Sequence, residues 1–448
     1  MKRRNFLKQQ FFAGIGGMLI PTGFNHLSAS PWFEFNEDLP VIQLTSGPEE
    51  HWFGYYDKQQ ISADGRYALG MQVDFSGRSP TADDVLTIGM VDLQSDNAEG
   101  QPRWIEVGES RAWGWQQGCM LQWVPGSSEE ILWNDRITSD RDGEQYITRL
   151  LNVKTKKVRT LPRAIYTVSP DGKFAMCADF ARIDNMRLGY GYKGGSDPFV
   201  DQKAPEKGGI YRMDLATGES ELVVSLNHIA QMPHRGQSVA DKWHYFNHLL
   251  VSPDSKRFIF LNRYRDFSLT PEMKAEPDAY AKYVRGNYTT RMYTADVNGD
   301  NIYELDQSGK TSHFIWRDPE HVLAWTNYLE SRGFFLFKDQ TRQVEWVGEG
   351  VMTENGHQTY LPGTNNEWIL NDTYPDKQNR KQTLYLYRVP TGKKVILGQF
   401  FEPPEIQGEW RCDLHPRYSV DGRKIVFDST HQNGQRQIYM IDISKIIG

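Results

Sequence analysis

A short turn phrase recurs along this chain of 448 residues. It reads SADGR at 62–66, SPDGK at 169–173, SPDSK at 252–256 and SVDGR at 419–423. Runs rich in β-branched and aromatic residues flank the copies. Asp-Gly and Pro-Asp-Gly between such runs favour β-hairpins, because glycine accepts a positive φ and proline presets the turn. The phrase therefore predicts a chain built largely from hairpins.

A second hairpin phrase alternates with the first, at residues 150–161, 210–224 and 384–398. Two hairpins supply four strands, which make one blade of a β-propeller. We expect residues 31–448 to form a single domain, an all-β, seven-bladed β-propeller, in which the strand-like residues 39–45 pair with the last blade and close the ring. Counting the hairpin pairs places the blades near 59–109, 116–161, 164–226, 245–308, 311–348, 355–399 and 411–446.

Two long insertions interrupt this pattern, at residues 184–209 and 271–287. The first is rich in glycine, tyrosine and aspartate, and the second predicts one or two helical turns. Long insertions on a rigid scaffold often build binding sites, whereas a disordered surface loop is the alternative for each.

Residues 1–30 have the layout of an export signal. Lys2, Arg3 and Arg4 precede an apolar run at 11–20, and small residues follow at 28–30. The paired arginines resemble a twin-arginine signal, with an ordinary Sec-type signal as the alternative. The apolar run is shorter than the roughly 20 residues that span a bilayer. We therefore expect an exported protein, periplasmic or secreted, without a membrane span.

The net charge of −6 argues against a nucleic-acid partner, which would call for a basic surface. Three cysteines in an exported chain leave at least one unpaired or bound to a metal, and they do not indicate a disulfide scaffold. The sequence contains no G-x-S-x-G, H-E-x-x-H or phosphate-binding loop motif. Aromatic residues, 13% of the chain, suit both a β core and a surface that stacks on sugars.

Histidines stand where three of the last four predicted blades begin. Residues 243–248 read WHYFNH, 355–358 read NGHQ and 411–417 read RCDLHPR. Side chains at these positions converge on the central channel of a propeller. Imidazole together with thiolate suits Zn²⁺ or another divalent transition metal. The pattern predicts a metal site, and hydrogen bonding between neighbouring blades is the alternative. The predicted ligands are His248, His357 and His415, with Cys412 or Asp413 as a further one.

The same polar residues suit β-elimination on a uronic acid, whose C5 proton lies next to a carboxylate. This reaction needs a cation to neutralise the carboxylate, a base for the proton and an acid for the leaving oxygen. Histidine and tyrosine serve as acids and bases, and arginine holds a carboxylate in its fork. The candidates are His244, Tyr245, Arg263, Arg136, Arg411 and Arg417, with Tyr190 or Tyr192 from the first insertion.

Three phrases resemble the propeller oligogalacturonate lyases and, more distantly, the propeller ulvan lyases of marine bacteria. They are NHLLVSPD at 247–254, GH at 356–357 and HPRYSVDGR at 415–423 with VFDS at 426–429. The resemblance implies a divalent metal held by channel histidines and cleavage by β-elimination. His357 and His415 match metal-ligand positions, and His248 is a looser match. Asp413 stands where that family has a histidine, and the family's arginine base has no assured counterpart.

The resemblance implies a carbon–oxygen lyase that acts on an acidic oligo- or polysaccharide of ulvan or pectin type. It leaves open whether the enzyme cleaves the chain or expels water from a uronate at the non-reducing end, as an oligosaccharide dehydratase does. We expect a divalent metal such as zinc, manganese or calcium and no organic cofactor. The alternative function is a non-catalytic propeller that binds proteins or glycans as a scaffold.

Overall fold

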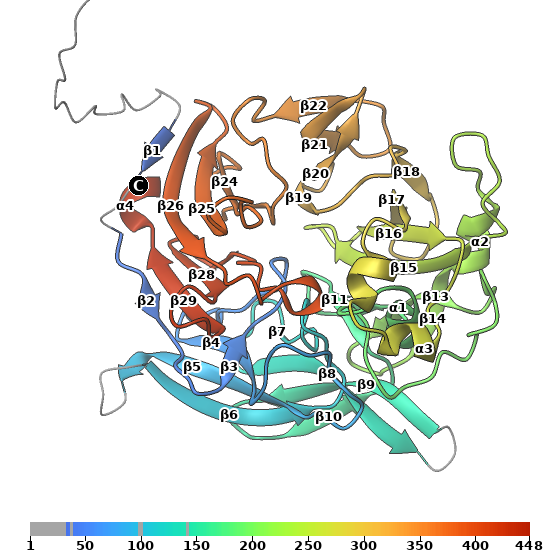
Figure 1. Cartoon of the computed structure of the whole chain (residues 1–448), viewed down its shortest axis with the longest axis horizontal. Coiled ribbons are helices and arrows are strands. Elements are labelled where there is room, and N and C mark those ends of the chain that lie inside the picture. Colours follow the sequence, from blue (N-terminus) through green and yellow to red (C-terminus); the bar gives the residue numbers. More distant parts are fainter. Residues whose placement is uncertain (1–32, 36–38, 97–101, 140–142) are drawn as a thin grey trace, which may run out of the picture.

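Seven β-sheets stand in a ring around a central axis (Figure 1). The computed structural model describes residues 33–35, 39–96, 102–139 and 143–448, so the predicted export signal lies outside the described residues. The predicted seven-bladed β-propeller is confirmed. In the part of the chain that is described, no helix combines the length and the apolarity needed to cross a membrane.

The blades follow one another in chain order, and each runs from an innermost strand to an outer one. Blades 1 to 4 consist of β3 (Glu50–Trp52), β4 (Tyr67–Val73), β5 (Leu86–Asp96) and β6 (Pro102–Ser110); β7 (Gln122–Trp123), β8 (Glu130–Ser139), β9 (Gly143–Asn152) and β10 (Val158–Leu161); β11 (Ile165–Val168), β12 (Phe174–Cys177), β13 (Gly209–Asp214) and β14 (Ser220–Ser225); and β15 (Trp243–Val251), β16 (Arg257–Arg265), β17 (Thr289–Asp296) and β18 (Tyr303–Asp306).

Blades 5 to 7 continue the series, and the first strand of the last two is only two residues long. They consist of β19 (Phe314–Asp318), β20 (His321–Tyr328), β21 (Ser331–Lys338) and β22 (Val344–Val347); β23 (Thr359–Tyr360), β24 (Trp368–Asn371), β25 (Lys381–Arg388) and β26 (Lys393–Phe401); and β27 (Arg417–Tyr418), β28 (Lys424–Ser429) and β29 (Gln437–Asp442).

Two strands from the beginning of the described chain cover the outer edges of the last two blades (Figure 1). β2 (Ile42–Gln43) pairs antiparallel with β29 and supplies the fourth strand of blade 7. β1 (Phe33–Phe35) pairs parallel with β26 in blade 6. Such pairing satisfies backbone groups that an open edge would leave exposed.

Apolar side chains fill the spaces between neighbouring blades. One buried cluster joins blades 1 and 2 and includes Trp52, Trp115 and Trp123. Another joins blades 6 and 7 through residues such as Leu370 and Phe427. Because both faces of each sheet are covered by its neighbours, inner strands such as β28 (KIVFDS) read as nearly continuous buried runs.

Polar side chains on or just after the second strand of three blades bind the backbone of the next blade. Asn134 on β8 accepts a hydrogen bond from the Ile165 amide and donates one to the Ile165 carbonyl, both at 2.8 Å. Asp428 on β28 accepts from the amides of Phe53 and Gly54 in blade 1, each at 3.2 Å. These bonds fix the position of one inner strand relative to the next.

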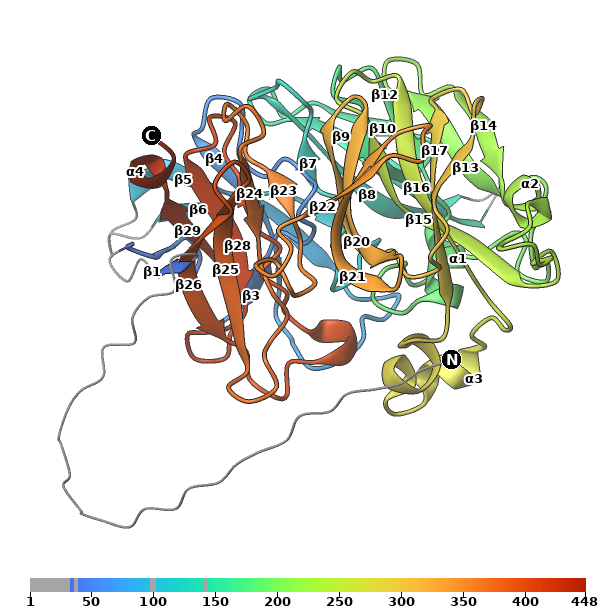
Figure 2. The same cartoon turned by 90° about the horizontal axis from the view of Figure 1, so that it is seen from above.

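The two insertions lie together at one end of the ring (Figure 2). The first insertion (178–208) contains α1 (Phe180–Met186), and the second insertion (266–288) contains α3 (Pro271–Ala275) and a π-helical turn, η1 (Tyr280–Val284). Three further short helices complete the described chain: α2 (Leu226–Gln231), η2 (Gly408–Trp410) and α4 (Ser444–Ile447). The predicted helical turns in the second insertion are present.

Contacts between the insertions are both polar and apolar. Lys274 pairs with Asp184 at 2.6 Å. Leu188 of the first insertion packs with Leu269 and Val284 of the second. The insertions therefore form one cover, held by side chains from both.

Replacing Asp428 with alanine tests the junction between blades 7 and 1. Asp428 also pairs with Arg417 at 2.8 Å, and both side chains are buried. Its removal leaves a buried guanidinium unpaired, so we expect the free energy of unfolding to fall by about 3–5 kcal/mol. Chemical denaturation measures the change, and Asp241→Ala, at an exposed position, is the control with an expected loss below about 1 kcal/mol. Equal losses in the two variants would contradict this role.

Candidate functional site

Four buried histidines, one from each of blades 4 to 7, meet in the centre of the ring. They are His248, His313, His357 and His415. The rings of His313 and His357 lie 4.2 Å apart between centroids, as do those of His357 and His415. The rings of His248 and His313 are 6.5 Å apart. Each residue lies on or just before the innermost strand of its blade, as the sequence pattern predicts for three of them.

The backbone at two of these histidines departs from regular strand geometry. His248 and His415 have φ of 52° and 42°, a left-handed conformation that non-glycine residues adopt infrequently. The pairing of β15 with β16 shifts register between Asn247 and Leu250, which marks a bulge around His248. Bulges redirect a side chain out of the alternating strand pattern. Such irregular backbone recurs at functional sites.

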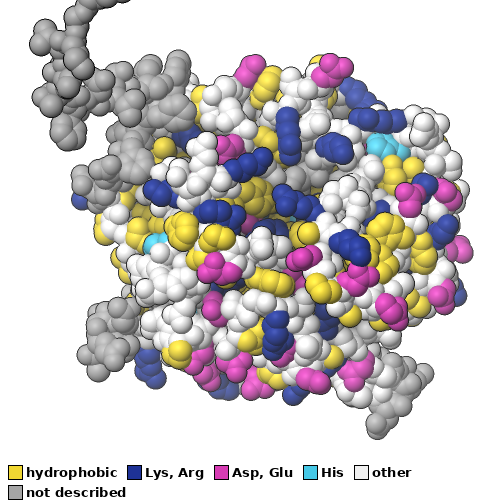
Figure 3. All heavy atoms as spheres, viewed as in Figure 1, with side chains coloured by type: hydrophobic (Ala, Val, Ile, Leu, Met, Phe, Trp, Pro, Cys, Tyr) yellow, Lys and Arg dark blue, Asp and Glu magenta, His cyan; other side chains and the backbone are white. Residues whose placement is uncertain are grey.

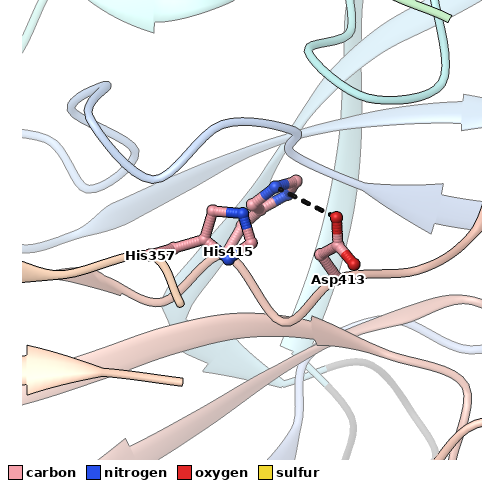
Figure 4. Close-up of side chains that lie close together, drawn as sticks. All are labelled: His357, Asp413 and His415. Atoms are coloured by element: carbon pink, nitrogen blue, oxygen red, sulfur yellow. Dashed lines mark ion pairs between the residues drawn. The ribbon is translucent and has the colours of Figure 1, made fainter. Parts of the chain in front are cut away.

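Three side chains form a group suited to a metal ion (Figure 4). One ligand atom each from His357, Asp413 and His415 lies within 4.8 Å of the others, and all three residues are buried. Asp413 Oδ1 and His415 Nε2 have no hydrogen-bond partner in the described structure. Buried polar atoms without partners are costly, and a cation between them would satisfy both. Imidazole and carboxylate donors fit divalent ions such as Mn²⁺ and Zn²⁺.

Asp372 orients both histidines of this group. Its carboxylate accepts from the His357 amide at 2.6 Å and lies 3.0 Å from His357 Nδ1. It also accepts from the His415 amide at 3.2 Å. A carboxylate on one ring nitrogen fixes the orientation of a metal-binding histidine and leaves the other nitrogen for the ion. Asp372 directly follows β24 and repeats the inter-blade contact made by Asn134 and Asp428.

A segment that follows β3 in blade 1 crosses toward blades 4 and 5. The Tyr55 hydroxyl lies 2.6 Å from His248 Nδ1. The Tyr56 hydroxyl donates to the Phe314 carbonyl at 2.6 Å. The Tyr55 ring is also 5.2 Å from the His415 ring. The segment thus places a hydroxyl–imidazole pair beside the candidate metal ligands.

Burial sets the protonation states of these groups. It lowers the pKa of His248 well below 6.5, with further lowering by the charge of Arg187, and it lowers the pKa of His313 and His415 in the same direction. Burial raises the pKa of Tyr55 well above 10. His248, His313 and His415 are therefore neutral, and Tyr55 keeps its proton, near neutral pH. Neutral imidazoles bind metal ions and accept protons.

Arginines from the first insertion and from the loop before blade 7 border the histidines. Arg411 Nε donates to Asp413 at 2.9 Å, and its terminal nitrogen donates to the Tyr190 hydroxyl at 3.0 Å. The Arg187 guanidinium lies 3.9 Å from the centre of the Tyr190 ring, which is 6.0 Å from the His248 ring. In Figure 3 Lys and Arg side chains gather around the hollowed centre of the face shown, despite the net negative charge.

The structure brings part of the predicted set together. His248, His357, His415, Tyr190 and Arg411 all lie at this centre. Tyr245 and Arg263 lie beside it, close to Arg187 and Tyr288 respectively.

Other candidates have structural partners that leave little capacity for a ligand. Arg417 is bound by Asp428 and Gln60. Arg136 donates to backbone carbonyls of Ala82 and Lys193 and pairs with Glu144.

His244 contacts the Val239 carbonyl at 2.8 Å and Asn262 at 3.3 Å, which occupies both ring nitrogens. The Tyr192 hydroxyl accepts from Asn134. The Cys412 thiol is buried, burial raises its pKa, and it is absent from the ligand group found among the described residues. Of the two alternatives for the further ligand, Asp413 is the one in position.

Several residues of the centre are absent from the sequence-based candidates. The sequence could have indicated His313, because it precedes the first strand of blade 5 just as His357 and His415 precede those of blades 6 and 7. No local sequence pattern marks Tyr55, Asp372 or Arg187, since their partners are remote in sequence or lie in another blade.

Two solved structures share this architecture across nearly the whole chain. An oligogalacturonate lyase in complex with manganese matches with a TM-score of 0.60 and 13% identity, over 91% of this chain and 94% of that one. Oligogalacturonate lyase from Vibrio parahaemolyticus matches with a TM-score of 0.58 and 13% identity, over 92% and 96%. The chain has the fold of the oligogalacturonate lyases. No family model and no curated protein matches the sequence.

The neutral histidines predict a stability that depends on pH. Unfolded histidines bind protons near pH 6.5, whereas folded His248, His313 and His415 do so only at much lower pH. The free energy of unfolding therefore keeps its full value above pH 6.5 and falls as the pH drops below 6.5. The slope is about 1.4 kcal/mol per pH unit for each such histidine.

Denaturation of the metal-free protein between pH 7.5 and 5 measures this slope. We expect His313→Gln to reduce it by the share of one histidine, and the exposed control His228→Gln to leave it unchanged. An unaltered slope in the His313 variant would show that this histidine is not held neutral.

Proposed function

We propose that this protein is a carbon–oxygen lyase that acts by β-elimination on a uronic acid of an acidic oligo- or polysaccharide. The observation that carries the proposal is the position of the His357–Asp413–His415 group next to the Tyr55–His248 pair. The His357–Asp413–His415 group suits neutralisation of a substrate carboxylate, and the Tyr55–His248 pair suits transfer of a proton. β-Elimination at a uronate needs both within one pocket.

His357, Asp413 and His415 would hold a divalent cation, as their free ring nitrogens and carboxylate oxygen allow. When bound, the ion supplies positive charge that stabilises the enolate formed from the uronate carboxylate. Arg411 orients Asp413 through its hydrogen bond. Asp372 holds the two histidine backbones and the His357 ring in place, so the ligands are arranged before substrate arrives.

The Tyr55–His248 pair would carry the proton. Both groups are neutral, and their 2.6 Å contact lets a proton pass between oxygen and nitrogen. His248 is uncharged before substrate binds, so its imidazole is in the form that accepts a proton. In this proposal the pair takes the C5 proton of the uronate and delivers a proton toward the departing C4 oxygen.

The two solved oligogalacturonate lyases support the proposal, because the same architecture, in one case with manganese, serves this chemistry in those proteins. The low identity does not specify the sugar, so pectin-type and ulvan-type uronates are both proposed substrates. The export signal predicted in residues 1–30 supports a proposed location in the periplasm or outside the cell.

The joined insertions favour an enzyme that acts on chain ends. Tyr190 of the first insertion and Tyr280 of the second both contact Arg411, so both insertions reach the site. A cover over one side of the channel fits a pocket for a terminal sugar better than an open groove for a polymer. We therefore favour removal of water or a short product from the non-reducing end.

Replacing His357 with alanine tests the chemistry. We expect loss of metal from the purified protein and a fall in kcat of at least about a thousandfold, because the enolate charge is no longer stabilised. The measurement is the ultraviolet absorbance of the unsaturated uronate, with metal content by mass spectrometry. His228→Ala, on the exposed face of α2, is the matched control.

Acidic oligosaccharides of ulvan and pectin type are the substrates of this test. New chain ends would identify a lyase, and loss of water without cleavage a dehydratase. No unsaturated product from any acidic glycan would contradict the proposal and favour a binding scaffold.

Replacing Lys274 with alanine tests the cover. The change removes the ion pair with Asp184 and so weakens the contact between the two insertions. We expect turnover of polymer to rise several-fold relative to turnover of tetrasaccharide, with a loss of stability below about 1 kcal/mol. Product sizing by chromatography gives the ratio. Lys282→Ala, whose partner Glu276 lies within the second insertion, is the control and should leave the ratio unchanged.

A further inference from the structure

Two buried arginines beside the histidines have no counter-charge. Arg187 is 7% exposed and Arg263 is 2% exposed. Within the residues that the structure describes, the Arg187 guanidinium has no hydrogen bond or ion pair, and two of its nitrogens are fully buried. Arg263 donates only from Nε, to the Thr290 hydroxyl at 3.2 Å, and another of its nitrogens is buried without a partner.

Three other buried arginines of this propeller show what is missing. Arg182 pairs with Asp197 at 3.0 Å, and Arg417 with Asp428 at 2.8 Å. Arg291 pairs with Glu304 at 2.8 Å. A buried charge is normally paired, because desolvation without compensation costs several kcal/mol. Arg187 and Arg263 depart from this rule.

The two unpaired cations face a common neighbour. Their guanidinium carbons lie 5.2 Å and 4.9 Å from the centre of the Tyr288 ring. Tyr245 is nearby, since it is the cross-strand partner of Arg263 in the pairing of β15 with β16. Its hydroxyl is fully buried and has no hydrogen-bond partner among the described residues. Three residues with unsatisfied donors therefore lie close together near Tyr288.

This cluster is separate from the candidate metal ligands but connected to them. Arg187 lies over the Tyr190 ring, Tyr190 accepts from Arg411, and Arg411 donates to Asp413. A ligand that reaches Asp413 and one that reaches Arg187 therefore lie on two sides of Tyr190. Adjacent positions of this kind suit two groups of one substrate.

We propose that Arg187, Arg263 and Tyr245 form a second anion subsite, which binds an oxyanion of the substrate other than the carboxylate neutralised at the metal group. The proposal rests on the proposed function for the identity of the whole substrate. Guanidinium donors and a hydroxyl match the oxygens of a sulfate ester or of a second carboxylate. The substrate is thus a uronate oligosaccharide with a further negative group on the same or the neighbouring sugar.

Inorganic sulfate is the first probe, used with metal-free protein, so that the result does not depend on catalysis. We expect sulfate to raise the melting temperature of the wild type in a saturable manner, because it binds only the folded protein. Arg187→Gln and Arg263→Gln should lose most of this shift. Arg332→Gln removes an exposed positive charge elsewhere and should keep it. An identical shift in all four proteins would mean an adventitious ion only and would overturn the proposal.

Stability without any anion gives a second readout. If the arginines are uncompensated, Arg187→Met should melt at or above the temperature of the wild type in sulfate-free buffer, since it removes an unpaired buried charge. If Arg187 serves only to hold the insertion, this variant should melt several degrees lower. The latter result would contradict the proposal even if sulfate binding could not be measured.

Substrate pairs then identify the source of the oxyanion. With matched oligosaccharides that differ only in a sulfate ester, Arg187→Gln should raise KM about 10- to 100-fold for the sulfated one alone if the subsite binds sulfate. If it binds a second carboxylate, the loss should follow the number of uronates. An equal effect on mono-anionic and di-anionic substrates would refute a second subsite.

The two proposals fail in different ways. Loss of activity in His357→Ala with unchanged sulfate binding supports both. Sulfate binding that depends on Arg187 without any unsaturated product would refute the lyase and retain the subsite. Lyase activity with the same KM in wild type and Arg187→Gln on every substrate would retain the lyase and refute the subsite.

Discussion

The contacts between one blade and the first strand of the next position the side chains at the centre of the ring. Asn134, Asp372 and Asp428 occupy related places, on or just after the second strand of their blades. Each binds backbone groups of the following blade. Hydrogen bonds from a buried side chain to amides are directional and costly to leave unmade, so they fix the register between blades as apolar packing alone cannot. The innermost strands, and with them the channel, are aligned by these bonds.

The candidate site uses the same contacts for a second purpose. Asp372 joins blades 6 and 7, and in doing so it orients His357 and holds the backbone of His415. Asp428 joins blades 7 and 1, and the amides that it binds immediately precede Tyr55 and Tyr56. A single change at either aspartate would therefore disturb stability and geometry together. The ring closure and the metal ligands depend on one set of buried carboxylates.

The sequence predicted the ring and half of its centre for a definite physical reason. Turn phrases such as SPDGK are local signals, so blades can be counted without tertiary information. Histidines before inner strands are also local, and the structure assembles those three with His313. Contacts between remote segments leave no such pattern: Tyr55 meets His248 across 193 residues. Arg417 and Arg136 were predicted as site residues but have structural partners. The sequence does not reveal whether a carboxylate or a backbone carbonyl already binds an arginine.

The blades and the two insertions differ in how firmly their side chains are fixed, and this difference suits them to different roles. His357, His415 and Tyr55 belong to segments fixed by neighbouring blades and are buried from every side. Arg187 and Tyr190 belong to the first insertion, whose link to the second insertion includes a partly exposed lysine. Chemistry that needs exact placement of a proton and a charge thus resides in the ring. Under the proposed subsite, recognition of the remaining substrate combines Arg187 of the first insertion with Tyr245 and Arg263 of blade 4. The length and charge of the insertions can change without altering the blades. Under the proposed function, a propeller of this kind can keep one reaction while it exchanges one acidic glycan for another.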